Sequence, residues 1–396
     1  MTRVVVIGGG ISGTAAALAA RASGADVTLV RGSSGATSLG VGAYDATPWE
    51  SSRAGRPLDA SCMQVLAQIG CISHPDAGAL LASSTGILRP ARAYDDALLD
   101  LSKVRAGRVL VLDAAVDGWD AGSLSRSYSA HALRGERSFE SLEGSFVKHT
   151  DERAMTFAEL ASRHDDPARL AWLAAAIKAA LNGSANVSAV LTPPILGADR
   201  SRGTELSALV GIPCGEAIAP FSSPAGRRFD AARDRALERA GVTTLDAWVT
   251  LISVLDKVTV EFEKGAQLEA DVVVLATGGL LGGGIVYTPA EHILATAVPP
   301  YPRRVFACGV DAPVRVGHDG KELLVPGSMF GLAAEQLAWP FTDHPIMERV
   351  GVLADQSRAS DRVYVAGDLV ADRPRTWLDA LASGAGAGLA ACASQP

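Results

Sequence analysis

Three glycines near the start of the chain have the spacing of a phosphate-binding turn. They are Gly8, Gly10 and Gly13, in the segment VVVIGGGISG. In such a turn the first glycine permits a tight bend, the second lets a pyrophosphate approach the backbone, and the third lets a helix pack on the strand. The first N–H groups of that helix face the phosphates. We therefore expect Gly8, Gly10, Ile11, Ser12 and Gly13 to hold the diphosphate of a dinucleotide.

An arginine stands where this kind of turn usually has an acid. A carboxylate about 20 residues after the glycines usually binds the ribose hydroxyls, but the second strand ends in Val30-Arg31-Gly32. Arginine here is compatible with the 2′-phosphate of NADP. It is equally compatible with a flavin nucleotide whose ribose is held by backbone groups and Ser33 or Ser34, or with an exposed arginine at a strand end. Arg31 alone does not decide among the three.

Three further segments favour a flavin. DVVVLATGG (271–279) and RVYVAGD (362–368) each predict a strand that runs into a glycine turn. Asp368 is placed to accept a hydrogen bond from a ribitol hydroxyl. SGAGAG (383–388) predicts a helix N-terminus whose N–H groups face the flavin edge that becomes anionic on reduction. In this order, the segments resemble the FAD fold of the fumarate reductase and glycerol-3-phosphate dehydrogenase class.

The elements that position these residues predict an α/β protein. Strands are expected over 3–7 and 27–30 with a helix over 14–23 between them, and 242–275 reads as strands separated by turns. We expect a Rossmann-like FAD-binding domain, with a parallel sheet and a β-meander, plus an inserted α+β cap domain. The expected pieces are 1–118, 226–285 and 357–396 for the FAD domain, and 119–225 and 286–356 for the cap.

A narrower resemblance rests on TLVRGSSGATSLGVGAYD (28–45), GIPCGEAIAPFSSPAGRRF (211–229), LATGGLLGGGIV (275–286) and the final VYVAGD. These segments are similar to the B-subunit family of the anaerobic glycerol-3-phosphate dehydrogenases. The acid is already missing in that family, so the resemblance implies FAD rather than NADP. The stretch 119–190 matches only loosely, and LVADRPRTWLDAL follows the Gly-Asp pair where the family often has a richer Gly/Asp loop.

The resemblance implies a subunit that passes electrons from a small hydroxy or amine substrate through flavin to a partner or quinone. It implies a second flavoprotein subunit and an iron–sulfur subunit as partners, and a cytoplasmic protein held at the inner face of the membrane through them. A stand-alone FAD enzyme with another substrate and a flavin electron-relay subunit without substrate chemistry remain alternatives. No histidine or cysteine lies in a sequence context typical of covalent flavin attachment, so we expect FAD to be bound non-covalently. The expected FAD contacts are Gly8, Gly10, Ile11, Ser12, Gly13, Arg31, Gly32, Thr37, Ser38, Gly42, Val249, Ala276, Thr277, Gly278, Gly367, Asp368, Gly384, Ala385 and Gly386.

The sequence offers fewer candidate catalytic residues than candidate FAD contacts. A flavin dehydrogenase needs a base near the reacting hydroxyl and, for an anionic substrate, a cationic clamp. Arg303 and Arg304 are the candidate clamp, because paired guanidinium groups suit phosphate and carboxylate. The candidate bases are His131, His149, His292 and His318.

Composition excludes several other classes. The 396 residues carry 36 Lys and Arg against 43 Asp and Glu, a net charge of −7, which argues against a nucleic-acid-binding protein. The five cysteines form no C-x-x-C pair, so no metal site is expected. We expect no signal peptide, because a strand and a glycine loop occupy its place, and no membrane span, because no long apolar run occurs.

Overall fold

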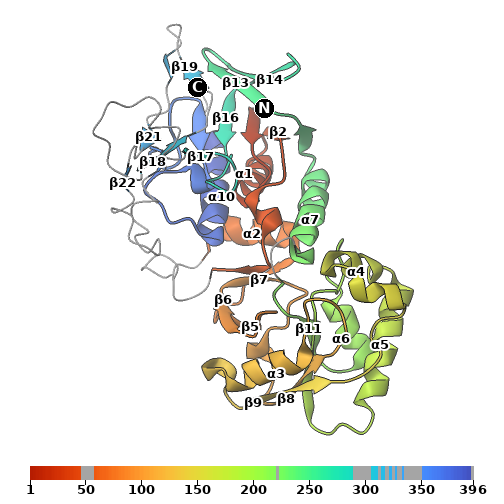
Figure 1. Ribbon diagram of the computed structural model, residues 1–396. Helices are drawn as coiled ribbons and strands as arrows, with labels where there is room; N and C mark the ends of the chain where they lie inside the picture. Colours follow the sequence, from red (N-terminus) through yellow and green to blue (C-terminus); the bar gives the residue numbers. More distant parts are fainter. Residues whose placement is uncertain are drawn as a thin grey trace. The chain divides into compact units, whose positions relative to one another are not determined.

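The computed structural model describes residues 1–45, 58–219, 223–288, 305–310, 314–316, 321–322, 326–327, 332–333 and 350–393. The chain divides into two compact units (Figure 1). Unit 1 comprises Met1–Thr37, Leu58–Ala67 and Arg235–Pro396, and unit 2 comprises Ser38–Pro57 and Gln68–Asp234.

A parallel sheet forms the centre of unit 1, which confirms the predicted Rossmann-like architecture. Its order is β12 (Thr243–Asp246), β2 (Asp26–Arg31), β1 (Arg3–Ile7), β16 (Val272–Leu275) and β24 (Val363–Val365). Every adjacent pair is parallel. β1, β2, β16 and β24 are short runs rich in valine, isoleucine and leucine, as expected of largely buried strands, whereas the edge strand β12 (TTLD) is mostly exposed.

Two helices of unit 1 pack directly on each other. They are α1 (Ile11–Ala22) and α10 (Trp377–Ala393). A Cβ at Gly384 would lie 2.1 Å from the carbonyl oxygen of Ser12, and one at Gly388 would lie 2.3 Å from that of Ala16. The backbones of the two helices therefore touch, and the glycines are what allows it.

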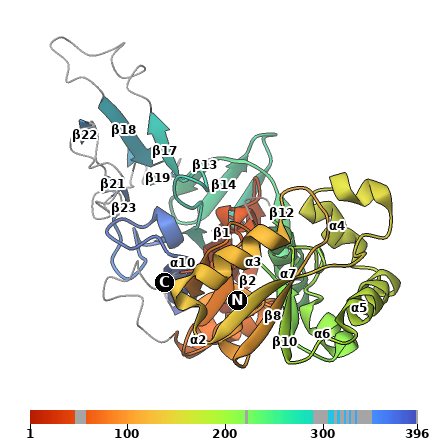
Figure 2. The same cartoon turned by 60° about the horizontal axis from the view of Figure 1, so that its bottom comes forward.

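The predicted meander is also present in unit 1. Strands β13 (Val249–Val254), β14 (Val258–Phe262) and β15 (Gln267–Ala270) are antiparallel neighbours. β13 also pairs with β19 (Val314–Val316), which pairs with β20 (Lys321–Glu322). Figure 2 shows the antiparallel pair β17 (Ile285–Thr288) and β18 (Val305–Val310). Other elements of unit 1 are β21 (Pro326–Gly327), β22 (Leu332–Ala333) and β23 (Gly351–Val352). Two helices contain a boundary between the units: α2 (Ala60–Ile69) has most of its residues in unit 1, and α7 (Pro224–Ala240) belongs to unit 2 up to Asp234.

Unit 2 has its own parallel sheet, in the order β11 (Cys214–Glu216), β10 (Val187–Thr192), β8 (Gly107–Leu112) and β9 (Arg137–Leu142). The helices described in this unit include α3 (Ala121–Ala130), α4 (Phe157–Arg163), α5 (Pro167–Leu181) and α6 (Gly203–Val210). Short strands complete the unit: β3 (Ala43–Tyr44), β4 (Ile72–Ser73), β5 (Ala79–Ala82), β6 (Leu88–Ala91) and β7 (Ala93–Asp95).

One expectation about this region was wrong. The single helix predicted over 156–182 is two helices, because Asp166 caps a new helix and Pro167 begins it. The two compact units group the chain differently from the predicted domains, whose bounds remain a prediction. Residues 68–118 belong to unit 2 rather than to the FAD domain, because β8 pairs with β9 and β10, and the described part of 286–356 belongs to unit 1.

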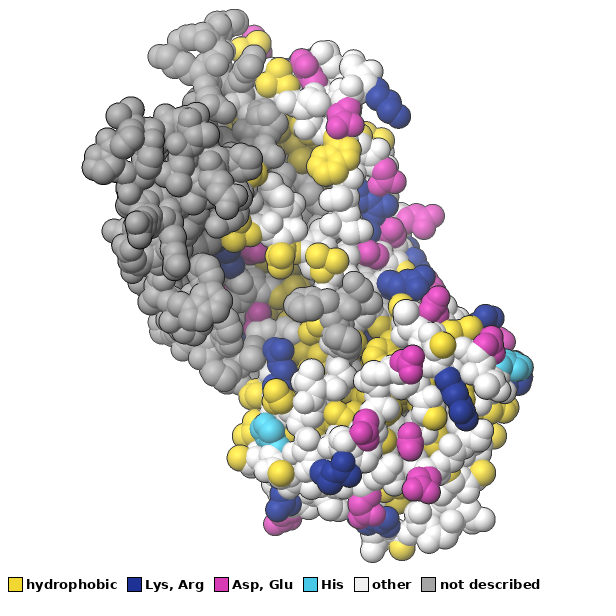
Figure 3. Space-filling model, in the orientation of Figure 1, with side chains coloured by type: hydrophobic (Ala, Val, Ile, Leu, Met, Phe, Trp, Pro, Cys, Tyr) yellow, Lys and Arg dark blue, Asp and Glu magenta, His cyan; other side chains and the backbone are white. Residues whose placement is uncertain are grey.

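On the face shown in Figure 3, acidic and basic side chains of the described residues are interspersed rather than gathered by sign. Among the described residues no helix has the length and apolar character needed to cross a bilayer. The same residues contain no cluster of His, Cys, Asp and Glu side chains able to hold a metal ion.

Candidate functional site

A cavity of about 430 Å³ lies in unit 1 at the carboxyl ends of the parallel strands. Ile7, Val30 and Leu275 end or nearly end their strands there. This edge is where open α/β sheets bind their ligands. The lining residues are Ile7, Gly8, Gly9, Gly10, Ile11, Ser12, Val30, Gly32, Ser33, Gly35, Ala36, Thr37, Ala247, Trp248, Val249, Ile252, Leu275, Ala276, Thr277, Gly278, Leu280, Leu281, Gly282, Gly283, Asp368 and Ala380.

The glycines of the turn have different structural roles. Gly8 has a φ of +123°, and a Cβ there would lie 2.0 Å from the carbonyl oxygen of Ala276. A Cβ at Gly13 would lie 1.8 Å from the carbonyl oxygen of Gly8, so these two positions shape the turn. A Cβ at Gly10 would come no nearer than 3.8 Å to another heavy atom, that of Thr37 Oγ1. The protein itself would therefore accommodate a Cβ at Gly10 in ordinary van der Waals contact, and the absence of that Cβ leaves the backbone at the first turn of α1 accessible to a diphosphate in the cavity.

The N-terminus of α1 has the features of an anion-binding site. The Ile11 N–H donates to Thr37 Oγ1 at 3.2 Å, and the N-cap residue Gly10 supplies no side-chain cap. The other N–H groups of the first turn lack helical partners, as at the start of every α-helix. The positive end of the helix dipole thus faces the cavity.

Arg31 forms an ion pair with an acidic residue on the neighbouring strand. Its Nε donates to Asp246 Oδ1 at 2.6 Å, and Asp246 ends β12 directly opposite Arg31 in the parallel register. The Arg31 side chain lies over Gly9 and is outside the set of residues lining the cavity. Of the three interpretations of Arg31, a 2′-phosphate partner is the least compatible with this geometry, because the cation is already paired.

The opposite end of the cavity carries Asp368 and Thr277. The hydroxyl of Thr277 is buried and has no hydrogen-bond partner among the described residues. A Cβ at Gly279 would lie 2.9 Å from that of Asp368, so the loop after β16 lies against the loop after β24. A buried hydroxyl without a partner and a carboxylate at the same cavity fit a polyol such as ribitol.

Several predicted contacts are not among the residues that line the cavity. Gly384, Ala385 and Gly386 are a correction: α10 begins at Trp377, so their N–H groups lie inside the helix and are bonded within it. They form no helix N-terminus. Ser38 and Gly42 belong to unit 2, where the Ser38 hydroxyl donates to Asp230 at 2.6 Å.

Gly367 shapes the backbone beside the cavity rather than lining it. It has a φ of +68°, and its N–H donates to Ser383 Oγ at 3.1 Å. The predicted contacts that line the cavity are Gly8, Gly10, Ile11, Ser12, Gly32, Thr37, Val249, Ala276, Thr277, Gly278 and Asp368. Sequence reasoning missed Trp248, the glycines Gly9 and Gly35, and the apolar pair Leu280 and Leu281.

The predicted catalytic residues His292, Arg303, Arg304 and His318 lie outside the described residues. The other two candidate bases belong to unit 2. His149 is exposed, and the Nδ1 of half-buried His131 accepts a hydrogen bond from the Leu133 N–H at 3.2 Å.

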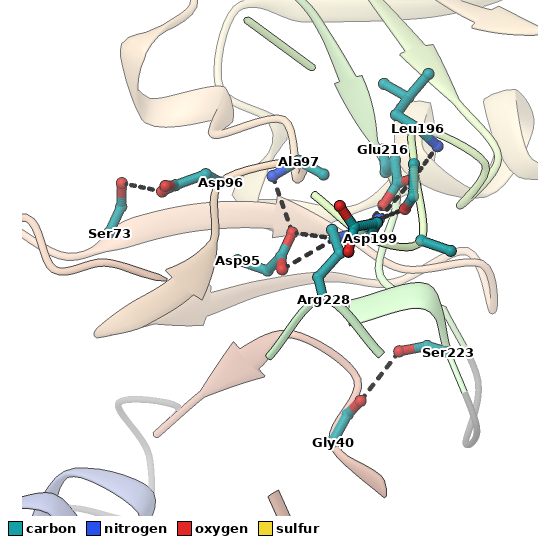
Figure 4. Close-up of polar contacts among 12 residues, drawn as sticks. Gly40, Ser73, Asp95, Asp96, Ala97, Leu196, Asp199, Glu216, Ser223 and Arg228 are labelled. Atoms are coloured by element: carbon teal, nitrogen blue, oxygen red, sulfur yellow. Dashed lines mark hydrogen bonds and ion pairs between the residues drawn. The ribbon is translucent and has the colours of Figure 1, made fainter. Parts of the chain in front are cut away.

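Unit 2 contains a buried ionic cluster of Arg228, Asp95 and Glu216 (Figure 4). Arg228 lies 3.0 Å from the Asp95 carboxylate and 2.7 Å from the Glu216 carboxylate. The carboxylates also accept hydrogen bonds from the N–H groups of Ala97 and Leu196. Burial raises the pKa of Glu216, while the Arg228 charge opposes that rise. Every charge in this cluster has a partner, so it joins α7 to β7 and β11 within unit 2 rather than offering an open site.

His164, at the end of α4, is a second buried titratable group of unit 2. Burial lowers the pKa of His164 from 6.5 to about 4, with a smaller contribution from the Arg169 charge. Neither ring nitrogen makes a hydrogen bond of ordinary geometry to the described residues. The ring is therefore neutral at pH 7.

Comparison with protein families gives one match. Residues 3–71, which begin at β1 and include the glycine turn, match the family model "Glucose inhibited division protein A". No curated protein matches the chain. The match and the parallel sheet together show a Rossmann-type FAD-binding domain, and FAD is the cofactor of this domain type.

Solved structures similar to the chain include the Diels-Alderase PyrE3 of pyrroindomycin biosynthesis (14% identity, TM-score 0.29, covering 97% of this chain and 63% of that one). Others are the tetracycline destructase Tet(51) (11%, 0.30, 98% and 79%) and 2-methyl-3-hydroxypyridine-5-carboxylic acid oxygenase (15%, 0.30, 98% and 80%). The chain spans 63%, 60% and 60% of the length of the first three structures it matches. TM-scores this low are no basis for assigning an activity.

Proposed function

We propose that the chain is a flavin-dependent oxidoreductase whose FAD lies in the unit 1 cavity. The observation that carries this proposal is the convergence of four loops, after β1, β2, β16 and β24, on one cavity. Gly10 and the start of α1 would hold the diphosphate, and Asp368 and Thr277 would hold the ribitol. Bound FAD supplies a two-electron acceptor, and these residues bind and orient it.

The test is FAD binding by the purified apoprotein, followed by the visible absorption of bound flavin. We expect Asp368→Ala to weaken FAD binding about 10- to 150-fold, the value of a hydrogen bond to a charged group. Asp361→Ala is the matched control, because Asp361 lies on the same segment with a side chain 96% exposed and pairs with Arg358. Wild-type protein that binds no FAD would refute the proposal.

The finer proposal is a dehydrogenase subunit similar to the B-subunit family of the anaerobic glycerol-3-phosphate dehydrogenases, acting on a small hydroxy or amine substrate. The sequence resemblance supports it, and the pairing of Arg31 with Asp246 makes a 2′-phosphate partner the least compatible of the interpretations of Arg31. The second flavoprotein subunit, the iron–sulfur subunit and attachment to the membrane through them are part of this proposal. His292, Arg303, Arg304 and His318 remain its predicted catalytic residues.

Anaerobic mixing of the FAD-loaded protein with glycerol 3-phosphate tests the substrate. Bleaching of the flavin band by the isolated chain would support a stand-alone enzyme. Bleaching only after addition of co-purified partner subunits would support the subunit assignment. Absence of bleaching in both arms would refute a role in oxidising this substrate.

A further inference from the structure

Trp248 is a large aromatic side chain left exposed in the cavity wall. It is 56% exposed although it lines the cavity. Its backbone is fixed on both sides: the Ala247 N–H donates to the Arg31 carbonyl at 3.0 Å, and the Glu263 N–H donates to the Trp248 carbonyl at 3.1 Å. The indole is therefore presented by an ordered strand end rather than by a loose loop.

Gly32 provides the surface on which the indole lies. A Cβ at Gly32 would be 2.7 Å from Trp248 Cδ2 and 2.8 Å from Cε3. The ring thus covers the backbone at the end of β2, and any larger residue at position 32 would displace it. One part of the indole packs on Gly32, and the exposed remainder is available to a ligand.

The order of the strands places this indole at the nucleoside end of the cavity. In the order β12-β2-β1-β16-β24, the glycine turn follows the central strand β1. Thr277 and Asp368 follow β16 and β24 on one side of it, and Trp248 follows β12 on the other. A dinucleotide with its diphosphate at the turn and its ribitol beside Asp368 must extend its adenosine toward Trp248.

We propose that Trp248 stacks on the adenine ring of FAD and is the main side-chain determinant of adenosine affinity. This inference rests on the proposed function. Stacking needs no particular hydrogen-bonding edge, which suits a site whose nearby cation, Arg31, is paired with Asp246. Loss of one base–aromatic stack weakens binding about 5- to 150-fold.

The experiment measures binding of FAD, ADP and FMN to the apoproteins of wild type and four variants. Trp248→Ala should weaken FAD and ADP binding about 5- to 150-fold and leave FMN binding unchanged, because FMN has no adenine. Trp248→Phe should retain affinity within about fivefold, and Gly32→Ala should weaken FAD and ADP binding by displacing the indole. Leu255→Ala, at another exposed apolar residue of unit 1 outside the cavity lining, is the control and should change nothing.

A second readout is the tryptophan fluorescence of the protein. Stacking on adenine quenches indole emission, so ADP should quench the Trp248 fluorescence of the wild type. This quenching should be absent in Trp248→Phe. If wild type binds FAD but Trp248→Ala binds FAD and ADP equally well, the inference is overturned and the proposed function stands. Equal losses for ADP and FMN would also overturn it. If wild type binds neither FAD nor ADP, the proposed function itself fails.

Discussion

Two glycines in α10 should respond in opposite directions to the same substitution. A Cβ at Gly384 would lie 2.1 Å from the carbonyl oxygen of Ser12 and 2.8 Å from its Cα. A Cβ at Gly386 would have no other atom within 4 Å. Both positions lie inside the same helix, so alanine improves helix propensity equally at both, and only the packing differs.

The magnitudes follow from these distances. Alanine replaces glycine inside a helix with a gain of about 1 kcal/mol in the free energy of unfolding. Gly386→Ala should therefore be stabilising by about 0.5–1 kcal/mol. Overpacking costs about 1–3 kcal/mol, and Gly384→Ala lies at the upper end because its clash is with backbone atoms, so its net loss is about 2 kcal/mol. Since Ser12 lines the cavity, Gly384→Ala should also weaken FAD binding.

Urea unfolding of the two variants, followed by far-UV circular dichroism, measures the first effect. Titration of each apoprotein with FAD measures the second. If Gly384→Ala matched Gly386→Ala in stability and bound FAD like wild type, the close contact of α1 with α10 would be wrong, and with it the role of the C-terminal glycines.

The further predictions concern charged groups. Arg228→Met should lower the free energy of unfolding by about 3–5 kcal/mol, because it leaves buried carboxylates unpaired. Burial raises the pKa of Glu216 in the folded state. The contribution of Glu216 to the free energy of unfolding is therefore complete below its ordinary pKa and declines as the pH rises. Glu216→Gln should remove this decline when unfolding curves are measured over a series of pH values. Burial lowers the pKa of His164 from 6.5 to about 4, so the free energy of unfolding decreases as the pH falls through this range. Near pH 4, His164→Leu should therefore unfold less readily than the wild type. Asp246→Ala removes the carboxylate that accepts from Arg31 Nε, and it should improve competition by adenosine 2′,5′-diphosphate against FAD about tenfold; unchanged competition would show that the arginine does not reach a 2′-phosphate.

The nucleotide sheet of unit 1 could be predicted because its signals are local. β1, β2, β16 and β24 are short runs rich in β-branched residues, and the glycine turn directly follows β1, whereas the edge strand β12 (TTLD) gives no such signal. The start of α10 was predicted too late in the chain, because its alanine- and glycine-rich interior hides the true beginning. The signal was present: the Thr376 hydroxyl accepts from the Asp379 N–H at 3.1 Å and donates to its carboxylate at 2.6 Å, in the T-x-x-D pattern of a helix start.

The sequence could not reveal contacts between distant segments. Trp248 lies on Gly32 only because β12 pairs with β2, and Arg31 meets Asp246 for the same reason. Assignment of residues 68–118 to unit 2 likewise depends on the pairing of β8 with β9 and β10. Pairing partners of parallel strands are set by packing of the whole sheet and leave no mark on either strand alone.

The position of β1 in the middle of its sheet has a consequence for synthesis. Among the strands of this sheet β1 and β2 are made first, but β16, the other neighbour of β1, is complete only after residue 275 and β24, the neighbour of β16, only after residue 365. Unit 2, which ends at Asp234, is complete before then. Throughout that interval one edge of β1, the apolar run RVVVI, waits unpaired, so this segment needs protection from aggregation. With Asp368 holding the cofactor as proposed, cofactor binding would follow translation of this residue.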